Sequence, residues 1–167
     1  MGRLGNQLFQ YATGKAVALR LGVGLQLSKN LMKKKWHGQT CLINNFNLKA
    51  EFSDDWLHKK TYQERYLIKN HLLHKANDIC PTFKEINNNT DLVGHFDNHL
   101  YFHEFRKEIT SELQLTSGEE EKAQTFLKGL KKKYGKNKEI VSIHFRRGDV
   151  TSQQPKLYHS GTSKALF

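Results

Sequence analysis

Two adjacent arginines, Arg146 and Arg147, are well suited to gripping an anion. They follow the mostly apolar run 140–145, which predicts a buried strand that ends where the polar residues begin. In open α/β sheets, ligands bind at this carboxyl end of a strand. Gly148 frees the two guanidiniums from strand geometry for bidentate hydrogen bonds, and Asp149 can hold one of them in place. These residues predict an anion clamp, the alternative being a pair of surface arginines after a core strand.

A second candidate anion site lies at the start of the chain, where residues 2–7 read Gly-Arg-Leu-Gly-Asn-Gln. The residues from Leu8 to Leu19 contain little that would interrupt a helix before Gly22, so a helix is predicted directly after the glycines. Glycine lets a backbone approach a ligand closely, Asn6 can cap the helix, and the first-turn N–H groups point outwards. A helix end of this kind stabilises an anion by roughly 0.3–1 kcal/mol. The pattern predicts a phosphate cradle, with ordinary turn chemistry before a helix as the alternative.

Three histidines, His95, His99 and His103, recur at intervals of four residues. On one helix their imidazoles would share a face and could ligate zinc. However, residues 91–96 are typical of a strand, and residues 97–98 of a turn, which would break that geometry. We therefore predict no metal site.

The chain is strongly basic, because 27 lysines and arginines against 16 aspartates and glutamates give a formal net charge of +11. This charge favours anionic partners such as nucleotide phosphates, nucleic acid or an anionic membrane surface. A length of 167 residues is enough for one domain, or for one domain and part of another. Only Cys41 and Cys80 are present, so two reduced thiols are expected rather than a disulfide framework. No run in the sequence reaches the ~20 apolar residues of a membrane-spanning helix.

These candidate residues need a framework, and the spacing of the apolar residues predicts helices that alternate with strands. Helices are predicted over residues 8–21, 62–73, 101–113 and 117–134, and strands over residues 22–27, 91–96 and 140–145. The last helix has an acidic first turn, an apolar stripe from Ala123 to Tyr134 and a stop at Gly135. Residues 151–167 carry no periodic apolar run and are predicted to form a loop or tail. The alternation indicates an α/β fold.

Three stretches carry recognisable motifs, namely residues 2–12, residues 94–102 and residues 144–149. Together they resemble the α-1,2-fucosyltransferase family, glycosyltransferase family 11. The first is similar to that family's N-terminal glycine motif and the Phe-Gln-Tyr-Ala helix after it. The second is similar to its Gly-Tyr-Phe-Gln-x-x-x-Tyr-Phe signature, with His-Phe-Asp at residues 95–97 in place of Tyr-Phe-Gln. The third matches its His-x-Arg-Arg-Gly-Asp motif, followed by Val150 where the family usually has tyrosine.

The resemblance implies a two-domain GT-B architecture. A Rossmann-like acceptor-side domain would occupy residues 1–138, and the first strand and loop of a truncated donor-binding domain would occupy residues 139–167. The resemblance covers most of residues 2–150 and implies an N-terminal fragment of an enzyme. The implied reaction is metal-independent transfer of L-fucose from GDP-fucose to the 2-hydroxyl of a galactoside, with inversion at the anomeric carbon. The implied donor site has Arg146 and Arg147 on the diphosphate, His144 and Asp149 in support, and Arg3, Gly5 and Asn6 on the opposite wall.

A basic, non-enzymatic module that binds phosphorylated or nucleic-acid partners is the alternative, and its affinity for DNA or RNA would fall steeply with salt. For the enzyme, the implied partners are GDP-fucose and a galactose-terminated glycan, with peripheral membrane association allowed and no nucleic acid expected. The implied location is cytoplasmic or membrane-associated in bacteria and the Golgi membrane in eukaryotes. The catalytic base stays open among His37, His58, Asp97 and Glu104.

Overall fold

The computed structural model describes residues 2–33, 35, 40–53, 60–63, 79 and 81–143. The chain divides into two compact units, Met1–Gln124 and Thr125–Phe167. The described residues combine helices with short parallel sheets, so the predicted α/β class is confirmed at the level of a mixed α/β fold.

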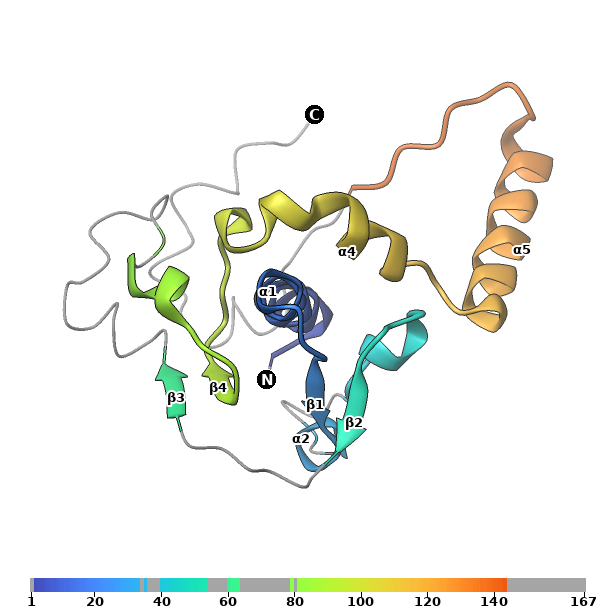
Figure 1. Cartoon of the computed structure of the whole chain (residues 1–167). Coiled ribbons are helices and arrows are strands. Elements are labelled where there is room, and N and C mark those ends of the chain that lie inside the picture. Colours follow the sequence, from blue (N-terminus) through green and yellow to red (C-terminus); the bar gives the residue numbers. More distant parts are fainter. Residues whose placement is uncertain are drawn as a thin grey trace, which may run out of the picture. The chain divides into compact units, whose positions relative to one another are not determined.

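Helix α1, Leu4–Leu21, is the central element of the first unit (Figure 1). The 3-10 turn η1 (Ile43–Asn45) and the helix α4 (Arg106–Glu112) both contact it. The small side chains of Ala12 and Ala16 are buried against Ile109 of α4, which allows the two helices to approach closely. Gly22 ends α1 in the left-handed conformation, with φ 66°, as the sequence predicts.

Within the described ranges, the strands form two separate parallel pairs (Figure 1). Strand β1 (Gln26–Ser28) pairs with β2 (Glu51–Ser53), and strand β3 (Lys60–Gln63) pairs with β4 (Thr90–Val93). A parallel pair needs a crossover segment, which for β1 and β2 contains the short helix α2 (Lys29–Lys33) and η1.

Two predictions about these strands need correction. The strand predicted over residues 22–27 begins only at Gln26, because Gly22 and the residue after it still bond back to the last turn of α1. The helix predicted from Tyr62 is wrong at its start, because Tyr62 lies in β3 and its ring joins the aromatic core. Residues 64–73 of that predicted helix lie outside the described residues.

A cluster of aromatic and aliphatic side chains forms the larger part of the described core. Its buried members are Val17, Phe83, Ile86, Phe96 and Tyr101. The rings of Phe83 and Phe96 both meet Tyr101 edge to face, with centroids 4.7 and 5.4 Å away. Phe96 is only 1% exposed and has φ 55°, a conformation that bulky residues rarely adopt. The buried ring therefore holds the backbone after β4 in this unusual turn.

The helix predicted over residues 101–113 is correct only from Arg106 onwards. Two separate 3-10 turns, η3 (His99–Tyr101) and η4 (His103–Phe105), precede α4. The Asn98 side chain starts η3 by accepting a hydrogen bond from the Leu100 N–H at 2.9 Å. Tyr101 and Ile109 are buried, so this segment packs onto the core.

The histidines at 95, 99 and 103 do not share a helix. As predicted, a strand comes first, although β4 ends at Val93 rather than at residue 96. His95 then lies in an irregular segment, whereas His99 and His103 begin two different 3-10 turns. Over the described part of the chain, no group of three or more His, Cys, Asp or Glu side chains could hold a metal ion.

Helix α5, Ser117–Tyr134, has the predicted acidic first turn and ends at Gly135, whose φ is 106°. Its start is fixed by a hydrogen bond of 2.8 Å from the Thr116 N–H to the Asn45 carbonyl. The predicted apolar stripe is not covered in the described residues, because Phe126 is 67% exposed and Tyr134 is 59% exposed.

The strand predicted over residues 140–145 is wrong for the part that the structure describes. Residues 140–143 form no strand, and Val141 and Ile143 are 81% and 72% exposed. A strand needs a neighbour for its backbone hydrogen bonds, and a run of apolar side chains does not by itself supply one. Residues 144–167, with the Arg-Arg motif, lie outside the described residues.

No helix in the described ranges combines the length and the apolar character that a bilayer crossing requires.

Candidate functional site

The start of α1 presents backbone N–H groups that have no partner within the helix. Arg3 precedes the helix with extended backbone, and the Gln7 N–H makes the first helical bond, 3.1 Å to the Arg3 carbonyl. The N–H groups of Leu4, Gly5 and Asn6 lie before that bond, an arrangement suited to an anion. The prediction that Asn6 caps the helix is wrong, because α1 already begins at Leu4 and no side chain caps it.

The two glycines of this turn have different surroundings. Gly2 is buried, and a Cβ added to it would lie 2.2 Å from Asn6 Nδ2, far inside van der Waals contact. Any larger residue at Gly2 must therefore displace the Asn6 side chain. Gly5 is exposed, and a Cβ added there would meet no atom within 4 Å. Gly2 is needed for packing, whereas Gly5 leaves open space beside the first turn.

The N-terminal stretch contacts the middle stretch directly. The Asn6 side-chain amide lies 3.2 Å from Nδ1 of His95, and the Gln10 amide donates a 2.8 Å hydrogen bond to the Gly94 carbonyl. One turn along α1, the Phe9 ring meets the Phe102 ring edge to face at 5.6 Å. Two of the three motif-bearing stretches, 89 residues apart at Asn6 and His95, are thus joined along α1.

Gln7 fixes the same turn from inside the fold. Its buried amide group donates to the Gly2 carbonyl at 2.8 Å and accepts from the Leu42 N–H at 2.9 Å. The Cys41 thiol also donates to the Gln7 oxygen, at 3.4 Å. Cys41 is a free thiol, as expected, and Cys80 lies outside the described residues.

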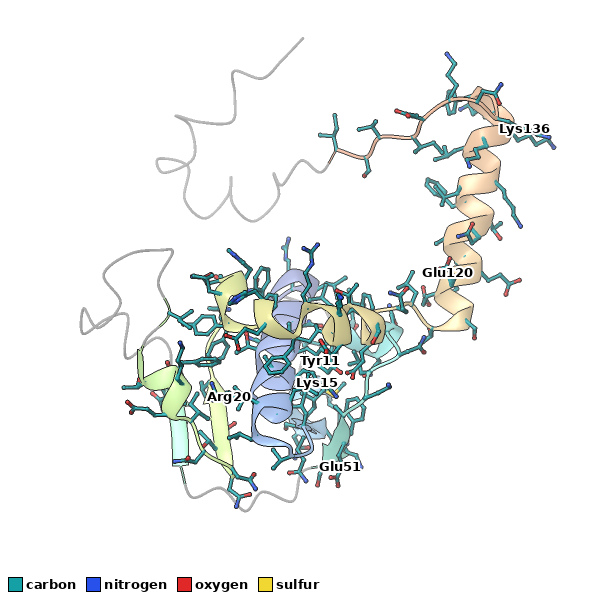
Figure 2. All side chains as sticks on the ribbon, turned by 45° about the horizontal axis from the view of Figure 1, so that its top comes forward. Tyr11, Lys15, Arg20, Glu51, Glu120 and Lys136 are labelled. Carbon is teal, nitrogen blue, oxygen red and sulfur yellow. The ribbon has the colours of Figure 1, made fainter. Side chains whose placement is uncertain are left out.

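A buried polar cluster lies further along α1, where Figure 2 shows Tyr11 and Lys15 beside α4. The Tyr11 hydroxyl donates a hydrogen bond to one oxygen of Glu112, and the Lys15 ammonium lies 2.9 Å from the other. The Lys49 N–H donates to the Tyr11 oxygen at 3.3 Å, and the Lys15 ammonium donates to the Lys49 carbonyl at 3.2 Å. The cluster ties α1 to α4 and to the segment before β2.

The cluster keeps its carboxylate ionised. Burial alone would raise the pKa of Glu112, but hydrogen bonds from Tyr11 and Lys15 and the charge of Lys15 more than offset it, so that pKa lies below its usual value. Burial, together with the hydrogen bond to the negative Glu112, raises the pKa of the Tyr11 hydroxyl well above its ordinary value. Tyr11 is therefore a neutral donor and Glu112 a charged acceptor at neutral pH.

The structure describes three of the seven residues predicted to bind the donor. Arg3, Gly5 and Asn6 adjoin at the start of α1, with Gly5 exposed and the other two partly buried. The other four, which are His144, Arg146, Arg147 and Asp149, lie outside the described residues, as do the candidate bases His37 and His58. The remaining candidate bases, Asp97 and Glu104, are exposed.

Sequence reasoning missed the polar line of α1 formed by Gln7, Tyr11 and Lys15. Their spacing of four residues puts them on one side of a helix, which is a detectable signal because the rest of the helix is mostly apolar. Glu112 and Gln10 gave no comparable signal, because their partners are distant in sequence.

Comparison with known proteins finds several relatives, among them the following three. Galactoside alpha-(1,2)-fucosyltransferase 2 of Oryctolagus cuniculus is 26% identical over 162 residues, which cover 95% of this chain and 41% of the relative. The protein of the same name from Rattus norvegicus is 28% identical over 158 residues, with 95% and 41% covered. Galactoside 2-alpha-L-fucosyltransferase Sec1 of Mus musculus is 27% identical over 157 residues, with 94% and 39% covered. The chain spans about two fifths of the length of these curated relatives.

No solved structure matches the chain significantly. A family model described as Glycosyl transferase family 11 matches residues 1–164, which is almost the whole chain. The match includes both stretches that the structure joins through Asn6 and Gln10. On this match, the chain belongs to glycosyl transferase family 11.

Proposed function

We propose that this chain takes part in metal-independent transfer of L-fucose from GDP-fucose to the 2-hydroxyl of a galactoside. Membership of the family supports glycosyl transfer, and the names of the relatives support fucose and a galactoside. The structural observation that carries the proposal is the contact of the glycine turn, residues 2–5, with the middle motif-bearing stretch, made by the Asn6 side chain and His95. This contact gathers two motif-bearing stretches at the start of α1, beside N–H groups suited to an anion.

In this proposal the chain is part of a GT-B architecture, and two groups of residues serve as ligands for the diphosphate of GDP-fucose. The first group, in the acceptor-side domain of residues 1–138, comprises the N–H groups of Gly5 and Asn6 and the Arg3 side chain. The second group, in residues 139–167, comprises Arg146 and Arg147, with His144 and Asp149 in support. Bidentate guanidinium contacts and helix-end N–H groups are both strong ligands for phosphate oxygens.

The reaction is a single displacement with inversion. The acceptor 2-hydroxyl forms a bond to the anomeric carbon of fucose, and the bond from that carbon to the β-phosphate oxygen breaks. The hydroxyl proton passes to a general base that stays unassigned, and the electron pair of the broken bond leaves with GDP. Preorganised arginines and N–H groups stabilise the charge that develops on GDP, so the proposed transfer proceeds in EDTA.

Binding experiments separate this proposal from the basic-module alternative. The chain is titrated by calorimetry with GDP and with a short single-stranded oligonucleotide at two salt concentrations. We expect saturable binding of GDP, whereas an affinity for the oligonucleotide that falls steeply with salt, without any response to GDP, would favour the alternative. Transfer of labelled fucose from GDP-fucose to lactose, measured in EDTA and in Mg²⁺, tests the reaction and its metal independence.

A further inference from the structure

We infer that the Asn6 side chain and His95 are positioning residues, which hold the Gly2–Gly5 turn so that its N–H groups face the donor phosphates. The inference rests on the proposed function, because it deepens the role of the same turn. In this inference the backbone N–H of Asn6 contacts the ligand, whereas its side chain acts indirectly by supporting the turn.

The Asn6 side chain is already engaged on two sides. Its amide nitrogen lies 3.2 Å from His95 Nδ1. A Cβ at Gly2 would lie 2.2 Å from the same nitrogen and 2.8 Å from Asn6 Cβ and Cγ, so the Asn6 side chain lies close beside Gly2. An amide held in this way cannot swing out to a ligand without breaking both contacts.

These contacts determine where the turn lies. Gly2 is held by the Asn6 side chain and by the Gln7 amide, which donates to its carbonyl at 2.8 Å. Gly2 precedes α1 and Gly5 lies in its first turn, whose N–H groups make no bond within the helix, so contacts from outside the helix help to keep these groups in one orientation. The Gln7 amide attaches the turn at the Gly2 carbonyl, and the Asn6–His95 pair attaches it at a second place. Two attachments fix the orientation of the turn, whereas one alone would let it rotate.

The hydrogen-bonding roles in this pair determine what His95 must provide. An amide N–H₂ can only donate, so Nδ1 of His95 is the acceptor in this pair. Asparagine at residue 95 can place a carbonyl oxygen close to the position of Nδ1. His95→Asn therefore keeps the acceptor, whereas His95→Ala removes it.

The experiment compares four single variants of the full 167-residue chain, Asn6→Ala, His95→Ala, His95→Asn and Gln10→Ala, and the double variant that combines Asn6→Ala with His95→Ala. Gln10→Ala is the matched control, because it removes another partly buried hydrogen bond between α1 and the same segment, one turn beyond the glycine turn. Three quantities are measured: melting temperature, GDP affinity by calorimetry, and amide hydrogen exchange by NMR at Gln7, whose N–H makes the first helical bond to the Arg3 carbonyl. Asn6 has its backbone amide in every variant.

We expect Asn6→Ala and His95→Ala to speed exchange in the turn and to weaken GDP binding by about three- to tenfold, which is the range that one hydrogen bond supplies. His95→Asn retains most of the affinity. Gln10→Ala lowers the melting temperature by a similar amount but leaves exchange in the turn and GDP affinity unchanged. The two effects of Asn6→Ala and His95→Ala are not additive in the double variant, because each breaks the same contact.

The outcomes separate this inference from the proposed function. If exchange in the turn is the same in Asn6→Ala as in Gln10→Ala, the positioning role is overturned whatever the protein binds. Equal loss of GDP affinity in Gln10→Ala and Asn6→Ala shows a merely structural role. If the turn loosens as expected but the unaltered chain does not bind GDP, the positioning of the turn stands and the proposed function fails.

Discussion

Replacement of Gly5 by alanine separates the demands of folding from those of ligand binding. Gly5 is the second residue of α1, is exposed, and a Cβ added there meets nothing within 4 Å. Its φ lies outside the left-handed range, so the substitution strains neither the backbone nor a neighbour. Alanine in a helix is more stable than glycine by about 0.5–1 kcal/mol. For a chain of this size we expect a melting temperature higher by about 1–4 °C.

Binding should change in the opposite direction. A phosphate oxygen that accepts from the first-turn N–H groups must come within about 3 Å of the backbone nitrogens. The new methyl group would occupy part of that approach, and we expect GDP affinity to fall about tenfold, or about 1.4 kcal/mol. Calorimetric titration with GDP and a thermal melt of the same sample measure both effects.

Gly118→Ala is the matched control for Gly5→Ala. Gly118 is also the second residue of an 18-residue helix, α5, is also exposed, and also has nothing within 4 Å of an added Cβ. It should raise the melting temperature by a similar amount and leave GDP affinity unchanged. Wild-type affinity in Gly5→Ala, together with the same gain in melting temperature, would refute the close approach of phosphate to Gly5.

Three further predictions concern the buried cluster and the Arg-Arg motif. Tyr11→Phe removes a hydrogen bond to a charged group, so it should destabilise the fold by about 2 kcal/mol and lower the melting temperature by about 4–8 °C. Because the folded pKa of Glu112 is lowered, its stabilising contribution is complete above its ordinary value of 4.5 and is lost as the pH falls through the folded value. Urea unfolding should therefore show a difference between wild type and Glu112→Gln that shrinks on acidification, and a constant difference would contradict this reasoning. Arg146→Ala and Arg147→Ala should each lower the rate of fucose transfer to lactose by about 10²–10³, and near wild-type turnover in both would exclude the clamp.

The parts of the fold that the sequence predicts well are those set by local chemistry. Gly22 and Gly135 end α1 and α5 because each adopts a positive φ that glycine tolerates. The strands were harder to predict, because a strand exists only where a partner lies alongside. Tyr62 fits a helical pattern in the sequence, yet pairing with Leu92 in β4 places it in a strand.

The candidate site shows the same division between local and distant causes. Gly2 and Gly5 are alike in the sequence, since both precede or begin one helix and both permit close approach of a ligand. The structure distinguishes them by a contact that no local pattern encodes: Asn6 fills the space beside Gly2 because His95, 89 residues away, holds it there. Gly2 therefore serves the internal packing of the turn, and Gly5 alone leaves room for a ligand. The two glycines that the sequence presents as one phosphate cradle thus have different roles: Gly2 supports the turn, and Gly5 leaves space for a ligand.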